Sequence, residues 1–229
     1  MKTAIVTGAT GNMGQAVVKK FLSEGYKVIG TIDPGHKAQA GIEDVNFEAV
    51  AVDLMNEEES QKFLETMIVK HESIDVLVAT VGGFAMGKIA DTRTSDITKQ
   101  YKLNFETAYN IAGPAFTHMI GKKNGRIFLV GSRPGSNSNY SKGMVAYGLA
   151  KSLIFRLAEL MNDEAKGTDV ITNVIVPSTI DTPPNRLSMP NANFDAWVTP
   201  ETIAGIIYFY CTKEAAALRE PVIKVYNNS

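Results

Sequence analysis

Short runs of apolar residues alternate along the chain with longer stretches in which apolar residues recur every three or four positions. Continuous apolar runs are typical of strands buried on both faces of a parallel sheet, and the longer period is typical of amphipathic helices. The runs predict strands at residues 3–7, 27–32, 45–52, 74–80, 126–130, 170–176 and 221–225. The periodic stretches predict helices at residues 14–24, 57–71, 95–119, 144–162 and 200–209. This order predicts an α/β fold in which helices cover both faces of a parallel sheet.

The segment from Pro177 to Pro200 interrupts the alternation. It holds four prolines before Pro200 and shows little periodicity. Loops of this length in compact domains are often functional, so we expect residues 177–200 to form a long loop over a substrate site. We find no internal repeat, low-complexity stretch or linker, and the 229 residues suit a single domain.

The composition is that of an ordinary globular protein, with 45% hydrophobic and 21% charged residues. A formal net charge of −1 without a long basic run argues against a nucleic acid or an anionic membrane as partner. No stretch approaches the ~20 apolar residues of a membrane span, and the first apolar run is too short for a signal peptide. Cys211 is the only cysteine, which excludes an internal disulfide and fits a reducing compartment. We therefore expect a cytoplasmic protein.

A glycine-rich turn lies between the first predicted strand and the first predicted helix. Its three glycines permit a tight turn and a close approach of the backbone to a pyrophosphate. The helix that follows offers free N–H groups and the positive end of its dipole. The order strand, turn, helix therefore predicts a Rossmann-type, doubly wound fold that binds a dinucleotide. The predicted contacts are Gly8, Thr10, Gly11, Asn12, Met13 and Gly14.

Asp33 follows the second predicted strand, about twenty residues after the glycine turn. A carboxylate there accepts hydrogen bonds from the adenosine ribose and repels a 2′-phosphate, so we prefer NAD(H) to NADP(H). His36 and Lys37 follow closely, and a cation can hold that phosphate, which leaves NADP(H) possible. The alternative is that Asp33 only stabilises the turn at Pro34-Gly35.

Asp53 ends the third predicted strand and precedes Leu54. A carboxylate at this edge of the sheet is placed to meet the adenine. The alternative is that Asp53 is the N-cap of the helix that follows, because aspartate is favoured at that position.

Tyr147 and Lys151 lie four residues apart in a predicted helix, so their side chains share one face. A free tyrosine titrates near pH ~10, but a neighbouring cation stabilises the phenolate and lowers its pKa. Such a pair can work as an acid–base group near neutral pH. The alternative is a tyrosine and a lysine paired by chance on the surface.

In this order and at these separations, the features resemble the short-chain dehydrogenase/reductase family over nearly the whole chain. The resemblance implies that Tyr147 donates and accepts the proton, and that Lys151 binds the nicotinamide ribose and lowers the pKa of the tyrosine. It implies that Ser132 orients the reacting group and that Asn104 supports a proton relay through water. The further positions that match the family's cofactor site are Asp53, Leu54, Thr80, Val81, Gly82, Pro177, Ile180 and Thr182; Thr199-Pro200-Glu201 completes the match.

Three departures from the family pattern stand out. The usual Asn-Asn-Ala-Gly is here residues 79–82, Ala-Thr-Val-Gly, which keeps the glycine and loses both amides. Ser132 lies fifteen residues before Tyr147 instead of thirteen, where this chain has Pro134. An insertion within residues 133–142 would still let Ser132 reach the site; the alternative is a serine that only ends a strand. The usual Pro-Gly pair is here Pro177-Ser178.

Residues 82–87, Gly-Gly-Phe-Ala-Met-Gly, and residues 181–197 are similar to the dihydropteridine reductases, a branch of the same family. This likeness implies NADH as cofactor and a dimer. That branch has alanine in place of Ser132, and tryptophan in place of Phe84. We expect a substrate pocket lined by four residues, although simple packing is the more common role of apolar side chains. They are Phe84, Met86, Met189 and Trp197.

We therefore expect an enzyme, without a metal, that transfers hydride between NAD(P)H and a small carbonyl or quinonoid dihydropteridine-like substrate. The family commonly forms subunit interfaces with the helices predicted at residues 95–119 and 144–162, which implies a homodimer or homotetramer. The alternative function is a catalytically weak, dinucleotide-binding sensor or regulatory protein of the same fold.

Overall fold

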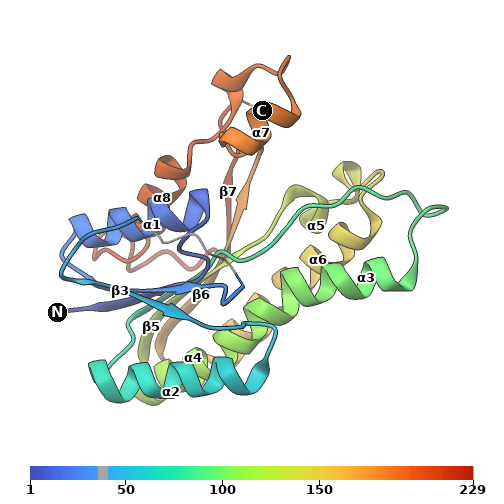
Figure 1. The fold of residues 1–229 in the computed structure, drawn as a ribbon. Helices are drawn as coiled ribbons and strands as arrows, with labels where there is room; N and C mark the ends of the chain where they lie inside the picture. Colours follow the sequence, from blue (N-terminus) through green and yellow to red (C-terminus); the bar gives the residue numbers. More distant parts are fainter. Residues whose placement is uncertain (36–40, 229) are drawn as a thin grey trace.

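The structure is a computed structural model that describes residues 1–35 and 41–228. Within these residues, seven strands form one parallel sheet in the order β3-β2-β1-β4-β5-β6-β7 (Figure 1). They are β1 (Thr3–Val6), β2 (Lys27–Ile32), β3 (Phe47–Ala51), β4 (Val76–Ala79), β5 (Asn124–Val130), β6 (Asp169–Pro177) and β7 (Val222–Val225). The predicted doubly wound parallel sheet is confirmed.

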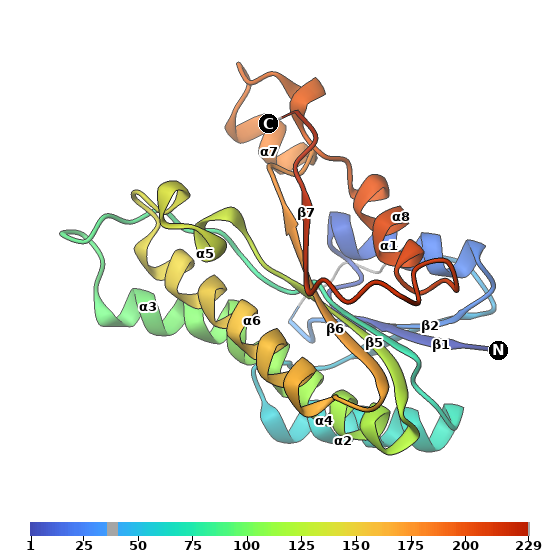
Figure 2. The same cartoon turned by 180° about the vertical axis from the view of Figure 1, so that it is seen from behind.

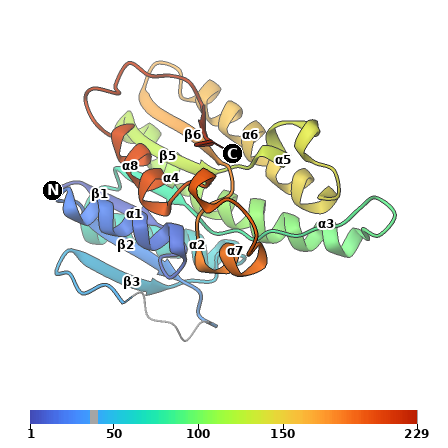
Figure 3. The same ribbon diagram turned by 90° about the horizontal axis from the view of Figure 1, so that it is seen from above.

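Helices cover both faces of the sheet, as Figures 2 and 3 show. One face carries α1 (Asn12–Ser23) and α8 (Pro200–Phe209), and the other carries α2 (Glu57–His71), α4 (Thr107–Lys122) and α6 (Val145–Glu164). The shorter helices are α3 (Thr94–Tyr101), α5 (Arg133–Ser136) and α7 (Pro183–Ser188). Among residues 1–35 and 41–228, no helix combines the length and the apolar character needed to cross a membrane.

The strands are apolar throughout because their alternate side chains enter two separate cores. In β1, Ala4 and Val6 belong to the core that contains Phe21 of α1. Ile5, between them, belongs to the core that contains Ile111 of α4. Both faces of the strand are thereby removed from water, which is the physical cause of the continuous apolar runs in the sequence.

β1 lies in the middle of the sheet, between β2 and β4. The connections from β1 run outward to β2 and β3 on one side, whereas β4 begins the half that continues to β7. In such a doubly wound sheet, a crevice opens at the carboxyl ends of the two strands where the order reverses. The glycine turn after β1 and the segment after β4 therefore meet at this crevice.

The single helix predicted at residues 95–119 needs a correction. α3 and α4 are joined by a π-helical turn at Lys102–Glu106, which contains Asn104. Such turns are frequent at functional sites.

The segment at residues 177–200, predicted as a long loop, also contains the short helix α7 and a 3₁₀ turn at Phe194–Ala196. Pro183 and Pro184 stand at the start of α7. The fixed φ of proline suits the first turn of a helix, and its missing N–H costs nothing there. The hydroxyl of Thr182 caps the helix by accepting a hydrogen bond from the N–H of Asn185 at 3.4 Å. Pro183 and Pro184, which interrupt the apolar period of the sequence, therefore mark the start of α7.

Candidate active site

A cleft of about 770 Å³ lies at the carboxyl edge of the sheet. It collects residues from the glycine turn, from the ends of β2 and β3, from the segment after β4 and from the segment that leads into α7. Most of the predicted cofactor residues line it; Tyr147 and Lys151 of α6, and Pro177, which ends β6, are not among the lining residues. The predicted cofactor residues that line the cleft are Gly8, Thr10, Gly11, Asn12, Met13, Gly14, Asp33, Asp53, Leu54, Thr80, Val81, Gly82, Ile180 and Thr182.

The glycine turn has the geometry that a pyrophosphate requires. Gly8 has φ +64°, a conformation that L side chains rarely adopt. A Cβ atom on Gly14 would overlap the carbonyl oxygen of Gly8, so only glycine lets α1 pack this closely on the turn. Gly11 occupies the N-cap of α1 and has no side chain to cover the first N–H groups of the helix. These groups and the helix dipole fit the phosphates of a dinucleotide.

Asp33 lies exposed at the end of β2, on the lining of the cleft. One carboxylate oxygen accepts a hydrogen bond from the N–H of Gly35 at 2.8 Å. The turn role that we considered is thus present, and it leaves the second oxygen for a ribose hydroxyl. His36 and Lys37 lie outside the described residues.

Asp53 also lines the cleft, but it does not cap α2. Its carboxylate accepts a hydrogen bond from the N–H of Met55 at 2.9 Å. The N-cap is Asn56, whose side chain accepts a hydrogen bond from the N–H of Glu59 at 3.2 Å. The capping alternative for Asp53 is therefore wrong. The Asn56/Glu59 spacing is the usual signal of a helix start and was available in the sequence.

Ala79 and Thr80 stand in the place of the two amides that the family pattern has after the fourth strand, and the hydroxyl of Thr80 pairs with Thr7. Thr7 Oγ1 accepts a hydrogen bond from the N–H of Thr80 at 2.9 Å, and Thr80 Oγ1 donates to the carbonyl oxygen of Thr7 at 2.5 Å. The two threonines tie the end of β1 to the end of β4, which closes the floor of the cleft.

The helix α6 places Tyr147 and Lys151 on one face, and Ser132 approaches them from the end of β5. The Ser132 side chain is buried and forms a hydrogen bond with Tyr147. The extra residues between them fold into α5 and a 3₁₀ turn at Ser138–Tyr140, so the longer spacing does not separate the two hydroxyl groups. Ser132 also caps α5, because its Oγ accepts a hydrogen bond from the N–H of Gly135 at 3.2 Å. Ser132 therefore has two roles: it caps α5 after the end of β5, and it contacts Tyr147 in the site.

Burial sets the protonation of the pair on α6. Burial raises the pKa of Tyr147, and the hydrogen bond with Ser132 opposes part of that rise. Burial also lowers the pKa of Lys151 to about 8, and its Nζ donates a hydrogen bond to the carbonyl oxygen of Val130 at 2.8 Å. The expected lowering of the tyrosine pKa by the lysine is not seen. Loss of water favours the uncharged form of both groups, so Tyr147 carries its proton at neutral pH.

Asn104 is held rigidly beside this pair. Its Nδ2 donates to the carbonyl oxygen of Gly83 at 3.0 Å and to Gln100 Oε1 at 2.9 Å, and its Oδ1 accepts from the N–H of Gly83 at 3.1 Å. A Cβ atom on Gly82 would lie 2.7 Å from Asn104 Oδ1 and 3.2 Å from Lys151 Nζ. The asparagine and the lysine therefore approach each other across a position that only glycine fits.

The four predicted substrate residues lie in different surroundings. Phe84 is 62% exposed and meets the ring of Tyr147 edge to face, with 5.2 Å between the ring centroids. Met86 and Met189 are exposed. Trp197 is only 7% exposed and packs on Phe194 with 4.9 Å between the ring centroids, so the packing interpretation holds for this residue.

Nine residues of the cleft lining were missed at the level of sequence, and three of them carry polar side chains: Thr31, Thr107 and Asn185. Thr31 Oγ1 accepts a hydrogen bond from the N–H of Gly8 at 3.3 Å, and thus steadies the glycine turn. Thr107 follows Asn104 by three residues, a spacing that places both on one side of a helix. Asn185 follows the capping residue of α7 and was hidden by the prediction of a loop.

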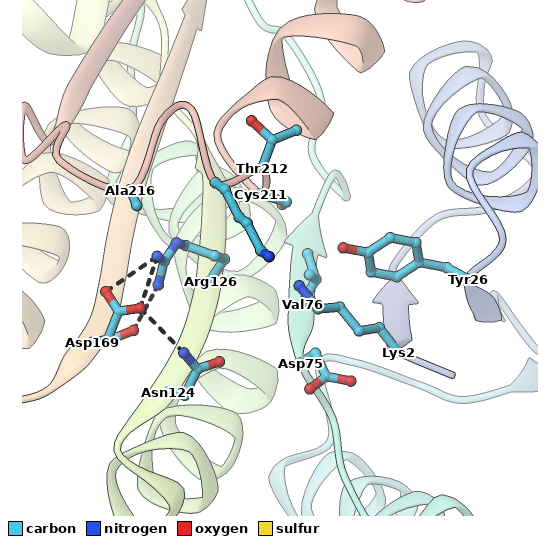
Figure 4. Close-up of a pocket in the computed structure, with 11 residues that line it drawn as sticks. Lys2, Tyr26, Asp75, Val76, Asn124, Arg126, Asp169, Cys211, Thr212 and Ala216 are labelled. Atoms are coloured by element: carbon cyan, nitrogen blue, oxygen red, sulfur yellow. Dashed lines mark hydrogen bonds and ion pairs between the residues drawn. The ribbon is translucent and has the colours of Figure 1, made fainter.

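A second hollow, of about 200 Å³, lies at the opposite, amino-terminal edge of the sheet (Figure 4). Its walls carry Arg126 and Asp169, whose side chains form an ion pair at 3.1 Å. Asp75, at its floor, accepts a hydrogen bond from the N–H of Thr3 at 2.7 Å. These charges hold the strand beginnings together, and we assign the hollow a structural role.

Comparison with known proteins shows which family the chain belongs to. Residues 2–192 match the family model described as short chain dehydrogenase. The chain is 25% identical over 189 residues to the acetoacetyl-CoA reductase of Acinetobacter sp. (strain RA3849), covering 80% of this chain and 75% of that protein. It is 28% identical over 217 residues to the dihydropteridine reductase of Dictyostelium discoideum, covering 92% of this chain and 88% of that protein.

Among solved structures, a short chain dehydrogenase from Bacillus anthracis str. 'Ames Ancestor' shares the fold. The TM-score is 0.86 at 21% identity, and the match covers 99% of this chain and 95% of that chain. The fold, the cleft and the match over residues 2–192 lead to one conclusion: the chain belongs to the short-chain dehydrogenase family of oxidoreductases, whose members bind NAD(P)(H).

Proposed function

We propose that this protein is an NADH-dependent reductase of a small carbonyl or quinonoid, dihydropteridine-like compound. The observation that carries the proposal is the group of buried Ser132, half-buried Tyr147 and buried Lys151, which adjoins the cleft at Gly82. A protonated phenol that is hydrogen-bonded to a serine is a proton donor held in one orientation. The cleft at the same edge of the sheet has the glycines, the helix N-terminus and the acids that a dinucleotide needs.

In the proposed reaction, a nicotinamide cofactor held by the residues that line the cleft would supply the hydride for the substrate carbon. Tyr147 transfers the proton of its O–H to the adjacent heteroatom, and the bond order between carbon and heteroatom falls by one. Ser132 holds the tyrosine hydroxyl in place. Lys151, one helical turn on, stabilises the phenolate that remains and supplies the proton that restores it. General acid help of this kind contributes about 10²–10⁴-fold.

Replacement of Tyr147 by Phe tests the assignment. We expect NADH affinity to remain and turnover to fall about 10²-fold or more, because the ring stays and the acidic proton is lost. The assay follows NADH absorbance with a panel of ketones and quinonoid dihydropteridine. Tyr210→Phe is the control, because Tyr210 precedes Cys211 at the opposite edge of the sheet. Turnover that is unchanged in Tyr147→Phe contradicts the assignment. Binding of NADH without turnover on any substrate would support a sensor instead.

The preference for NADH rests on Asp33. This residue lines the cleft, and its carboxylate would repel a 2′-phosphate. We expect Asp33→Ser to raise kcat/KM with NADPH by about 10-fold or more, since one unpaired like charge costs at least about 1.4 kcal/mol there. Equal kcat/KM values for NADPH in the variant and the unmodified protein would show that Asp33 does not discriminate.

The substrate class is supported from two sides. The exposed Phe84 ring, edge-on to Tyr147, gives a planar substrate an aromatic wall. The 28% identity to a dihydropteridine reductase agrees with a flat, quinonoid substrate. Ser132 favours a plainer ketone, because a hydroxyl beside Tyr147 can polarise a carbonyl. The substrate panel decides between the two.

We also infer that the protein is a homo-oligomer. Leu149, Leu153 and Leu160 are exposed along α6, and Tyr109 is exposed on α4. A groove of about 690 Å³ runs between these helices and α2. Light scattering after size exclusion tests this inference: a mass of 24.8 kDa, that of one chain, would contradict it.

A further inference from the structure

The helix α5 is a four-residue helix that stands between Ser132 and the start of α6. It is made from the residues that lengthen the spacing between Ser132 and Tyr147. It contacts the site on one side and the carboxyl-terminal segment on the other.

On the first side, α5 crosses α6 at Lys151 with almost no space between the two backbones. A Cβ atom on Gly135 would lie 2.7 Å from the carbonyl carbon and from the Cβ of Lys151, and 2.9 Å from its carbonyl oxygen. On α6, a Cβ atom on Gly148 would lie 3.4 Å from the carbonyl oxygen of Pro134. Gly135 does not have a positive φ, so glycine is needed there for closeness alone.

The same glycine also contacts the serine. The N–H of Gly135 donates its hydrogen bond to Ser132 Oγ at 3.2 Å. Ser132 in turn forms the hydrogen bond with Tyr147. Gly135 thus connects Ser132 with Lys151 through its own backbone, and any shift of α5 against α6 changes the position of the serine hydroxyl relative to the tyrosine.

On the second side, Arg133 fastens α5 to the end of the chain. Its guanidinium lies 4.0 Å from the centroid of the Tyr226 ring and 5.5 Å from that of the Tyr140 ring. Tyr226 follows β7, and its carbonyl oxygen accepts a hydrogen bond from Ser178 Oγ at 2.9 Å. Cation–π contacts of this kind hold a guanidinium in a fixed place.

We propose that α5 is a positioning element for the reaction, and that Gly135 and Arg133 are positioning residues that keep Ser132 beside Tyr147. The proposal rests on the proposed function for its kinetic consequence. Its structural consequence, the Ser132–Tyr147 hydrogen bond, holds whatever the substrate is.

The test is a double-mutant cycle of Gly135→Ala with Ser132→Ala. We expect Gly135→Ala to lower kcat by about 10- to 100-fold, because a displacement of a reacting group by ~1 Å has that effect. We expect NADH affinity, measured by fluorescence titration, to stay unchanged. If Gly135 acts through Ser132, adding Gly135→Ala to Ser132→Ala lowers kcat no further. Additive effects would overturn the proposal, because they would show that Gly135 acts independently of the serine.

Two further variants complete the test. Gly205→Ala in α8 is the control for a helical glycine, since a Cβ there meets nothing within 4 Å, and we expect its kcat to be unchanged. If Gly135→Ala does not fold, Arg133→Met enters the same cycle, with Arg133→Lys expected to retain part of the activity.

A crystal structure of the folded variant gives a readout without turnover. We expect the Ser132 and Tyr147 hydroxyl oxygens to move beyond hydrogen-bond distance. An unmoved Ser132 refutes the positioning role. If the unmodified protein shows no turnover, only the proposed function is refuted. The distance between the Ser132 and Tyr147 hydroxyl groups in the variant then still decides whether α5 has the positioning role.

Discussion

Lys151 is a lysine inside the protein, 4% exposed, with its Nζ hydrogen-bonded to the carbonyl oxygen of Val130 at 2.8 Å. Lys151→Met keeps most of the side-chain volume and removes the ammonium group. The variant therefore separates the cost of burying a charge from the benefit of filling the space. Because protonation depends on pH and packing does not, the two contributions differ in their pH dependence.

Burial lowers the pKa of Lys151 to about 8, from 10.5 for an unperturbed lysine. Between these values the unfolded chain binds more protons than the folded protein, so the free energy of unfolding rises with pH. Below pH 8 the folded protein carries the full cost of the buried charge, about 3 kcal/mol. Integration from pH 7 to pH 9.5 predicts that the unmodified protein gains about 2 kcal/mol relative to Lys151→Met.

The assay is urea unfolding without cofactor, at several pH values from 7 to 9.5. Trp197, the only tryptophan and a buried one, reports the transition by fluorescence. Lys19→Met on the exposed side of α1 is the control and should give a stability difference that is independent of pH. If the difference in free energy of unfolding between Lys151→Met and the unmodified protein also does not change with pH, the reasoning is refuted, because Lys151 would then be solvated in the folded state.

Two further predictions concern the floor of the cleft. Gly14→Ala should weaken NADH binding about 10-fold or more, because the new Cβ overlaps the carbonyl oxygen of Gly8 and moves α1 away from the phosphates; fluorescence titration measures this, and Gly121→Ala, whose Cβ meets nothing within 4 Å, is the control. Thr7→Val should lower the free energy of unfolding by about 1–3 kcal/mol, because the N–H of the half-buried Thr80 loses the hydroxyl of the buried Thr7 as its acceptor. A urea midpoint that does not move would show that water replaces the lost hydroxyl.

Parts of the site follow from patterns within a few residues of one another. Tyr147 and Lys151 share a face because the helical period is local, and the glycines of the turn stand where a strand passes into a helix. The spacing of Asn56 and Glu59 predicts the start of α2 in the same way. We considered Asp53 as the cap instead and did not use this spacing. These are short-range rules, and they hold before the chain folds.

Other parts depend on neighbours that are far away in the sequence. That Ser132 meets Tyr147 depends on how residues 133–142 fold. The direction of the Tyr147 pKa was wrong for the same reason. The sequence shows a cation four residues away, whereas the loss of water around both groups arises only when sheet and helices enclose them.

The sequence by itself determined the doubly wound sheet, the glycine turn and the pairing of Tyr147 with Lys151, because apolar period and turn chemistry act over a few residues. The tertiary structure alone decided that α5 seats Ser132 against α6 and that the lysine loses its solvent. The physical reason is the sequence separation over which these interactions act. Gly135 and Lys151 lie 16 residues apart, and both their backbone contact and the loss of water around the lysine exist only once the chain has folded around the site.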